Sequence, residues 1–244
     1  GYYGLPQNRW RVFIFCAKNG LNLPNFPKPH YLFHRSTIFG ATKFRKNVVK
    51  AQKEADLFWN PKEMVTVGDA MKDLPPIPNG GGDEVMDYLA PPQSEYQKNI
   101  RIGSTSVYDH CCANMGPIMF ERISAVPKKK GAGWHDLPDH LKPKNLVRSG
   151  SKGYENRFGR LHWEGTFNTI LTKAYPYWGR VIHPEQDRVI SVRESARAQG
   201  FPDTFIFTGK KDDKYKQVGN AVPIPLATSI GHEILKAHKL GLKK

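Results

Sequence analysis

Two arginines near the start of the chain, Arg9 and Arg11, are the first residues whose type and spacing suggest chemistry. A guanidinium is always charged and presents a planar fork of donors, so it can clamp a phosphate or a base oxygen. It can also stabilise negative charge that develops on a ring during attack by a nucleophile. At alternate positions of a strand the two side chains would project the same way. A solvated surface pair is the competing interpretation of this spacing.

Two further clusters lie in the last quarter of the chain, at residues 188–203 (RVISVRESARAQGFPD) and 217–226 (QVGNAVPIPL). Taken alone, the first predicts a well-capped helix and the second a Gly-Asn turn that leads into a helix. A glycine in such a turn lets the backbone approach a ligand closely, although Gly-Asn pairs are common in purely structural turns.

Cysteine, histidine and lysine give weaker signals. None of the three cysteines follows a proline, and their neighbours favour structural roles. His110 beside Cys111 and Cys112 would need one or two more convergent ligands to bind zinc, so we expect no metal site. The run Lys128-Lys129-Lys130 fits either a solvated loop or contact with a nucleic-acid backbone.

Several elements must position these residues. The apolar run 11–17 (RVFIFCA) predicts a buried strand, which prolines from Pro24 onward end as a loop. Capping patterns predict helices from Thr66 to about Leu74 and from Ser191 to Gln199, and another helix is expected around 116–126.

The end of the chain predicts one more helix. Pro223 and Pro225 suit its first turn. An apolar residue then recurs at every fourth position and forms one stripe, made of Val222, Leu226, Ile230 and Ile234.

The composition points to a polyanionic partner. Among 244 residues, 37 are Lys or Arg and 22 are Asp or Glu, which gives a net charge of +15. A hydrophobic share of 39% excludes a wholly disordered chain. No apolar run approaches the roughly 18 residues that span a bilayer, so we expect no membrane partner. Three cysteines argue against a disulfide scaffold and fit a reducing compartment.

In this order, the three clusters resemble motifs VIII, IX and X of DNA (cytosine-5)-methyltransferases, with Gln7-Asn8-Arg9-Trp10-Arg11 as the first of them. The span between motifs VIII and IX is where that family keeps its target recognition domain. Four stretches within this span are similar to eukaryotic members, namely 67–75, 108–110, 133–138 and 158–163. Maintenance-type enzymes and plant chromomethylases are the nearest relatives that the motifs suggest.

The resemblance implies an α/β fold, in which a partial Rossmann-like S-adenosylmethionine-dependent methyltransferase domain carries an irregular α+β target recognition domain. Residues 1–34 would end the catalytic domain, 35–182 would form the recognition domain, and 183–244 would return to the catalytic domain. A nuclear location is expected if the protein is eukaryotic.

The resemblance also implies roles for individual residues. In this family a cytosine is flipped out of double-stranded DNA, attacked by a cysteine and methylated from S-adenosylmethionine. Arg11 matches the residue that holds the flipped cytosine at its O2, and Arg9 matches one that helps orient the site. The motif X positions that line the cofactor pocket match Gly219, Asn220, Ala221 and Val222. Motif IX is a scaffold, so Arg193, Glu194 and Arg197 are expected to be structural.

Some of the family's parts are absent from this sequence. The chain has no Pro-Cys nucleophile motif, no Glu-Asn-Val motif and no Gly-rich cofactor loop, all of which precede motif VIII in the family. The first residues, Gly1 to Pro6, read as a turn in the middle of a fold. We therefore expect a C-terminal portion whose N-terminal catalytic half lies elsewhere, and which is inactive alone. The alternative is a catalytically inactive DNA-binding module or partner subunit.

Target choice is expected to depend on the segment 146–180, because loops on a rigid scaffold carry base-reading groups. Its donors are Arg148, Asn156, Arg157 and Lys173, and its flat apolar surfaces are Tyr154, Tyr175, Tyr177 and Trp178. The resemblance to maintenance enzymes implies an apolar pocket for the methyl group of the parental strand, with Tyr154 as a candidate wall. A hemimethylated or CG-containing site is therefore the expected target.

Overall fold

The computed structural model describes residues 1–32, 49, 60–148 and 154–241. Its helices and strands follow one another along the chain as α1 Val67–Met71, β1 Gly82–Met86, α2 Glu95–Ile100, β2 Val107–Cys111, α3 Pro117–Ala125, η2 Trp134–Asp136, η3 Asp139–Leu141, α4 Lys144–Arg148, β3 Gly159–Arg160, η4 Pro176–Trp178, β4 Arg180–Ile182, α5 Val192–Ala198, α6 Lys211–Asn220 and α7 Ile224–Gly241. No helix of the described part is both long and apolar enough to cross a membrane.

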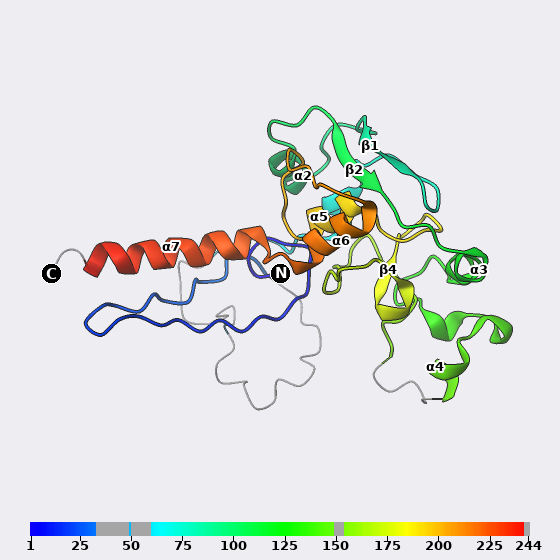
Figure 1. The fold of residues 1–244 in the computed structure, drawn as a ribbon, viewed down its shortest axis with the longest axis horizontal. Coiled ribbons are helices and arrows are strands. Elements are labelled where there is room, and N and C mark those ends of the chain that lie inside the picture. The colour runs from blue at the N-terminus through cyan, green and yellow to red at the C-terminus, as the bar shows by residue number, and fades with distance from the viewer. Residues whose placement is uncertain (33–48, 50–59, 149–153, 242–244) are drawn as a thin grey trace.

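Helix α5 occupies the centre of the body, and the other elements are arranged around it (Figure 1). All seven of its residues are buried, and it packs against α1, α6 and β2. Strands β1 and β2 form an antiparallel pair at one end of the body. Strands β3 and β4 form a short parallel pair that lies towards α3 and α4. This segment of motif IX is therefore the element on which the rest of the body is assembled.

The sequence-based helices are confirmed where their caps are local. Thr66 and Asp69 form a capping box at the start of α1, and Ser191 and Glu194 form one at the start of α5. Gly200 follows α5 with a φ of +81°, which suits glycine. Helices α3 and α7 also occupy the expected ranges.

The predicted buried strand at 11–17 is wrong in this structure. Val12 is 87% exposed and Ile14 is 83% exposed, and neither belongs to a ladder. A buried strand needs neighbours at its edges and faces, and the described residues provide none for this run.

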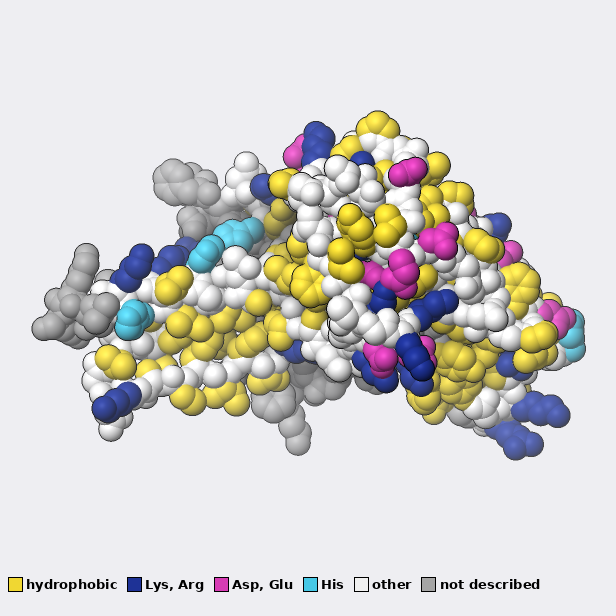
Figure 2. All heavy atoms as spheres, turned by 45° about the horizontal axis from the view of Figure 1, so that its top comes forward, with side chains coloured by type: hydrophobic (Ala, Val, Ile, Leu, Met, Phe, Trp, Pro, Cys, Tyr) yellow, Lys and Arg dark blue, Asp and Glu magenta, His cyan; other side chains and the backbone are white. Residues whose placement is uncertain are grey.

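The apolar stripe of α7 is also left largely uncovered. Val222 is 46% exposed and Ile234 is 48% exposed. Helix α7 and the N-terminal arm project from the same side of the body, and apolar side chains are gathered over this side (Figures 1 and 2). The exposed members are Val12, Ile14, Leu21, Leu23, Phe26, Val222, Ile234 and Leu235, which we call the apolar flank.

Candidate nucleic-acid interface

The three sequence clusters meet through two buried amide side chains. The Gln7 Nε2 donates to the carbonyl of Ala198 and to Oε1 of Gln199, each at 3.0 Å. The Gln199 Nε2 in turn donates to the carbonyl of Val218 at 2.9 Å. These hydrogen bonds hold together residues that lie about 190 positions apart in the sequence.

The predicted recognition segment is attached to the first cluster by its backbone. The Asn8 N–H donates to the carbonyl of Phe167 at 2.9 Å, and the Phe167 N–H donates to the carbonyl of Pro6 at 2.6 Å. The Thr169 hydroxyl reaches the carbonyl of Asn8 at 3.3 Å. Residues 167–169 therefore run beside 6–8, and a change in one segment will move the other.

Arg9 continues this junction. Its guanidinium donates to the carbonyl of Ile170 at 3.2 Å and to the carbonyl of Gly219 at 3.2 and 3.3 Å. Because both acceptors are backbone atoms of other segments, Arg9 positions them. A phosphate would have to displace these bonds to use the same donors.

A glycine is required at position 219 because the backbone of another segment approaches it closely. The chain does not turn at Gly219 and Asn220, as the sequence suggested, because both residues end α6. A Cβ at Gly219 would lie 2.5 Å from backbone atoms of Leu171 and Thr172. The glycine therefore lets α6 contact the recognition segment directly.

Arg11 differs from Arg9. It is exposed, and its Nη1 donates to the carbonyl of Trp10 at 3.0 Å. The expected alternation of two arginines on one side of a strand fails because no strand forms here. Apart from that bond, the donors of Arg11 have no partner among the described residues, and its neighbour Val12 is exposed on the apolar flank.

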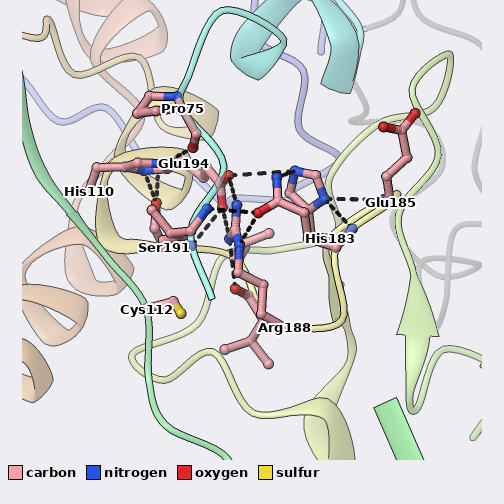
Figure 3. Close-up of polar contacts among 12 residues, drawn as sticks. Pro75, His110, Cys112, His183, Glu185, Arg188, Ser191 and Glu194 are labelled. Carbon is pink, nitrogen blue, oxygen red and sulfur yellow. Dashed lines mark hydrogen bonds and ion pairs between the residues drawn. The ribbon is translucent and has the colours of Figure 1, made fainter. Parts of the chain in front are cut away.

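Motif IX is held by an ion pair inside the body (Figure 3). The Arg188 guanidinium donates to both carboxylate oxygens of Glu194, at 2.7 and 2.8 Å, and the Ser191 N–H donates to the same carboxylate at 2.7 Å. Burial would raise the pKa of Glu194, but Arg188 outweighs it and holds that pKa well below its usual range. The expectation that this motif is structural is consistent with this burial.

Two histidines, His110 and His183, border this pair (Figure 3). The His110 Nε2 donates to the carbonyl of Pro75 at 2.8 Å, so Nδ1 accepts from the Ser191 hydroxyl at 2.9 Å. The His183 Nδ1 accepts backbone N–H groups of Glu185 and Gln186. Burial lowers the pKa of His110, and lowers that of His183 to about 3. Within the described ranges no three His, Cys, Asp or Glu side chains gather as metal ligands would.

The low pKa of His183 predicts acid sensitivity. The pKa of His183 in the unfolded chain is about 6.5, so between pH 6.5 and about 3 the unfolded state binds a proton that the folded state does not bind. Stability is complete above pH 6.5, and we expect it to fall by about 1 kcal/mol per pH unit between pH 6 and 5. Urea unfolding of wild type and His183→Gln at several pH values measures this slope. Exposed His232, changed to Gln, is the matched control, and equal slopes in all three proteins would contradict the assignment.

Four of the predicted recognition residues come together. The Arg157 guanidinium lies 4.3 Å from the ring centre of Tyr154, 4.5 Å from that of Tyr177 and 5.4 Å from that of Trp178. Each distance is within the range of a cation–π contact. We call Tyr154, Arg157, Tyr177 and Trp178 the aromatic clamp. It borders a cavity of about 270 Å³ that Asn156 also lines.

The other predicted recognition residues lie elsewhere. Arg148 is exposed at the end of α4, and the residues that follow it, 149–153, lie outside the described ranges. Lys173 and Tyr175 line a different cavity, of about 450 Å³, beside α3 and α6. The recognition residues therefore divide between two hollows.

Two arginines that were not predicted as binding residues also bear on this region. Arg160 is buried and donates to the carbonyls of Ile123, Val126 and His183 and to Asp187, so it fastens the scaffold segment 158–161. Arg180 lines the cavity beside the aromatic clamp. Only its charge could have singled it out in the sequence, since its neighbours Gly179 and Val181 form no motif.

Comparison with known proteins identifies relatives along nearly the whole chain. A family model described as C-5 cytosine-specific DNA methylase matches residues 1–236. DNA (cytosine-5)-methyltransferase 1A of Oryza sativa is 37% identical over 97% of the chain, and DNA (cytosine-5)-methyltransferase 3 of Arabidopsis thaliana is also 37% identical over 97%. DNA (cytosine-5)-methyltransferase 1 of Gallus gallus is 33% identical over 96%.

The chain spans 16 to 19% of the length of these relatives. Among solved structures, a DNA modification methyltransferase encoded within a prophage of E. coli has a TM-score of 0.51 at 20% identity, over 73% of this chain and 49% of that one. This likeness, together with the mixture of helices and strands, confirms the expected α/β methyltransferase fold. The chain belongs to the C-5 cytosine-specific DNA methylase family.

Proposed function

We propose that this chain is the C-terminal portion of a DNA (cytosine-5)-methyltransferase, which recognises target DNA and completes the site where cytosine is methylated at C5. The observation that carries this proposal is the junction of motifs VIII, IX and X through Gln7, Gln199 and Arg9. The junction holds the recognition segment against residues 6–9, two positions before Arg11, and so couples the residues proposed to read DNA to the residue proposed to act on the base.

In this proposal Arg11 acts on the flipped cytosine. A nucleophile that adds to the ring pushes negative charge towards the O2 of the base, and a fixed guanidinium there lowers the barrier. Arg11 is exposed and has free donors, so it is available for this contact. Arg9 acts as a positioning residue, because its donors hold the backbone of Ile170 and Gly219.

The cofactor of the proposed reaction is S-adenosylmethionine, which supplies the methyl group when bound. Asn220 and Val222 fit one wall of its pocket, since Asn220 exposes an amide at the last residue of α6 and Val222 exposes an isopropyl group just beyond it. Ala221 is partly buried between them. Gly219 precedes these residues, and because it has no Cβ the backbone of Leu171 and Thr172 can pack directly against it.

The proposed partners are double-stranded DNA and an N-terminal catalytic half that belongs to the same protein or to a second chain. The apolar flank supports the second partner, because such a large uncovered apolar surface marks an interaction site. Residues 11–17 would then gain the strand neighbours that the sequence pattern predicts. The nuclear location proposed for the complete protein rests on its plant and animal relatives.

The remaining proposal concerns the target. The aromatic rings of the clamp support a base-reading role for part of 146–180, with Tyr154 as one wall of an apolar pocket. A hemimethylated or CG-containing duplex is the proposed substrate. Grafting 146–180 into a relative and sequencing the methylated products tests whether the segment determines this choice.

The rival function is that of a DNA-binding module without catalysis, and the missing Pro-Cys motif favours it. We expect the 244-residue chain to transfer no methyl group from S-adenosylmethionine to DNA, and to gain activity when joined to the N-terminal catalytic half of a plant relative. Incorporation of labelled methyl groups measures both. Turnover by the chain alone would contradict the assignment of its missing parts, and a silent hybrid that still binds DNA would favour the rival.

A further inference from the structure

Arg180 is a partly buried cation that has no partner. Its Nε is buried and makes no hydrogen bond, and none of its donors has a partner in the described part of the chain. Burial lowers the pKa of Arg180, and no neighbouring acid raises it again. A buried N–H without an acceptor is costly, so the position of this Nε calls for an explanation.

The protein treats its fully buried arginines differently. Arg160 pairs with Asp187 at 2.9 Å, and Arg188 pairs with Glu194 at 2.7 Å. Arg197 pairs with both Asp73 and Asp203. Arg180 therefore differs from the fully buried arginines of the described chain, and it shares with Arg9 a buried Nε that makes no hydrogen bond.

A second cation faces the same cavity. Arg157 is stacked in the aromatic clamp, and no hydrogen bond or ion pair of its guanidinium is present among the described residues. The lining contains two arginines and no carboxylate, and its other polar members are Asn156, Asn168 and Thr169. Two positive charges over one small hollow repel each other unless an anion lies between them.

The backbone is shaped to keep Arg180 in this place. Gly159 pairs with Arg180 across β3 and β4, and a Cβ at Gly159 would lie 2.8 Å from both Cβ and Cγ of Arg180. The glycine therefore lets the arginine stem lie flat across β3. Tyr154 and Tyr177 flank the Arg157 guanidinium, which leaves the edges of its fork available to an acceptor.

We propose that this cavity binds one phosphate group of the DNA backbone, with Arg180 and Arg157 as its cationic ligands. A phosphate carries the charge that the lining lacks and accepts two guanidinium forks at once. A neutral base edge would satisfy donors but would leave the two charges uncompensated. The inference rests on the proposed function only for the source of the phosphate, because the cavity's preference for an anion is a property of this chain.

The first test uses inorganic phosphate and needs no DNA. In NMR spectra of the 244-residue chain, the Nε–Hε resonances of Arg157 and Arg180 should shift with added phosphate and stay in place with sodium chloride of equal ionic strength. Arg180→Gln should abolish the shift at Arg157. Arg180→Lys, which keeps the charge and loses the fork, should weaken it and shows that the fold survives. If these resonances do not shift when phosphate is added to the wild-type chain, the proposal is overturned, whether or not the chain binds or methylates DNA.

The second test asks whether DNA is the source. Each neutralised phosphate adds about 0.9 to the slope of log affinity against log salt, so Arg180→Gln should flatten that slope by about this amount for every duplex sequence. Lys98→Gln removes one charge from exposed α2 and is the matched control, with no expected change. An unchanged slope would leave a free anion as the occupant and overturn the DNA assignment. A changed sequence preference with the wild-type slope would show that the cavity reads a base edge, which also overturns it.

Discussion

Arg197→Ala is expected to lower the free energy of unfolding by about 3–5 kcal/mol, the usual cost of removing one partner from a buried ion pair. The Arg197 guanidinium contacts Asp73 at 2.5 Å and Asp203 at 2.6 Å, and all three side chains are buried. It also donates to the carbonyl of Ala70 at 2.8 Å. The substitution leaves two buried carboxylates short of a cation, and domains of this size are stable by only about 5–15 kcal/mol. Urea unfolding followed by circular dichroism measures the loss.

Two further variants separate charge from packing. Arg197→Met fills most of the same volume, so it should be nearly as unstable as Arg197→Ala if the loss comes from the missing cation, which leaves Asp73 with Arg101 alone and Asp203 with Arg193 alone. Lys98→Ala breaks an exposed pair with Glu95 and should leave the midpoint unchanged. A stable Arg197→Met variant would show that Arg197 acts through its volume, and that its ion pairs add little.

The parts of the fold that were predictable are those whose causes lie within a few residues. A capping box joins Thr66 to Asp69 and another joins Ser191 to Glu194, so four neighbouring residues determine where α1 and α5 begin. The same holds for Gly200, whose positive φ follows the end of α5. Such signals are complete in the sequence because the hydrogen bonds that they describe are local.

The errors come from causes that lie far along the chain. The pattern at 11–17 describes a strand correctly only when other strands flank it, and none of the described residues does so. Gly219 looked like a turn residue, yet its role is set by Leu171 and Thr172, almost fifty positions away. A sequence pattern records that glycine is present, and only the packing shows what approaches it.

The sequence predicted which segment holds the candidate site, but it did not predict how the side chains of that segment are arranged. The aromatic clamp lies within the predicted range, because aromatic and basic residues alternate there. Lys173 belongs to the same range but lines another cavity, and Arg180 gained its importance only through the parallel pairing with Gly159. Which donors share a hollow depends on strand register, and residue type alone does not fix register.

Arg11→Ala is expected to slow methyl transfer by about 100- to 1,000-fold, since one donor to developing charge contributes about 2.7–4 kcal/mol in the transition state. The measurement is single-turnover methylation by the hybrid of this chain with the N-terminal half of a plant relative, beside the affinity of the same protein for duplex DNA. Affinity should change little, because the contact strengthens only when charge forms on the ring.

The structure supplies an internal control for this prediction. Arg11 is exposed and, among the described residues, bonds only to the carbonyl of Trp10, so its loss should leave the thermal midpoint unchanged. Arg9→Ala removes three hydrogen bonds to Ile170 and Gly219 and should lower both the midpoint and the rate. Arg11→Lys keeps the charge without the fork and should recover part of the rate. Lost affinity with an unchanged single-turnover rate at saturating DNA in Arg11→Ala would make Arg11 a phosphate clamp, because a contact made equally in the ground state and the transition state weakens binding without slowing the bound complex.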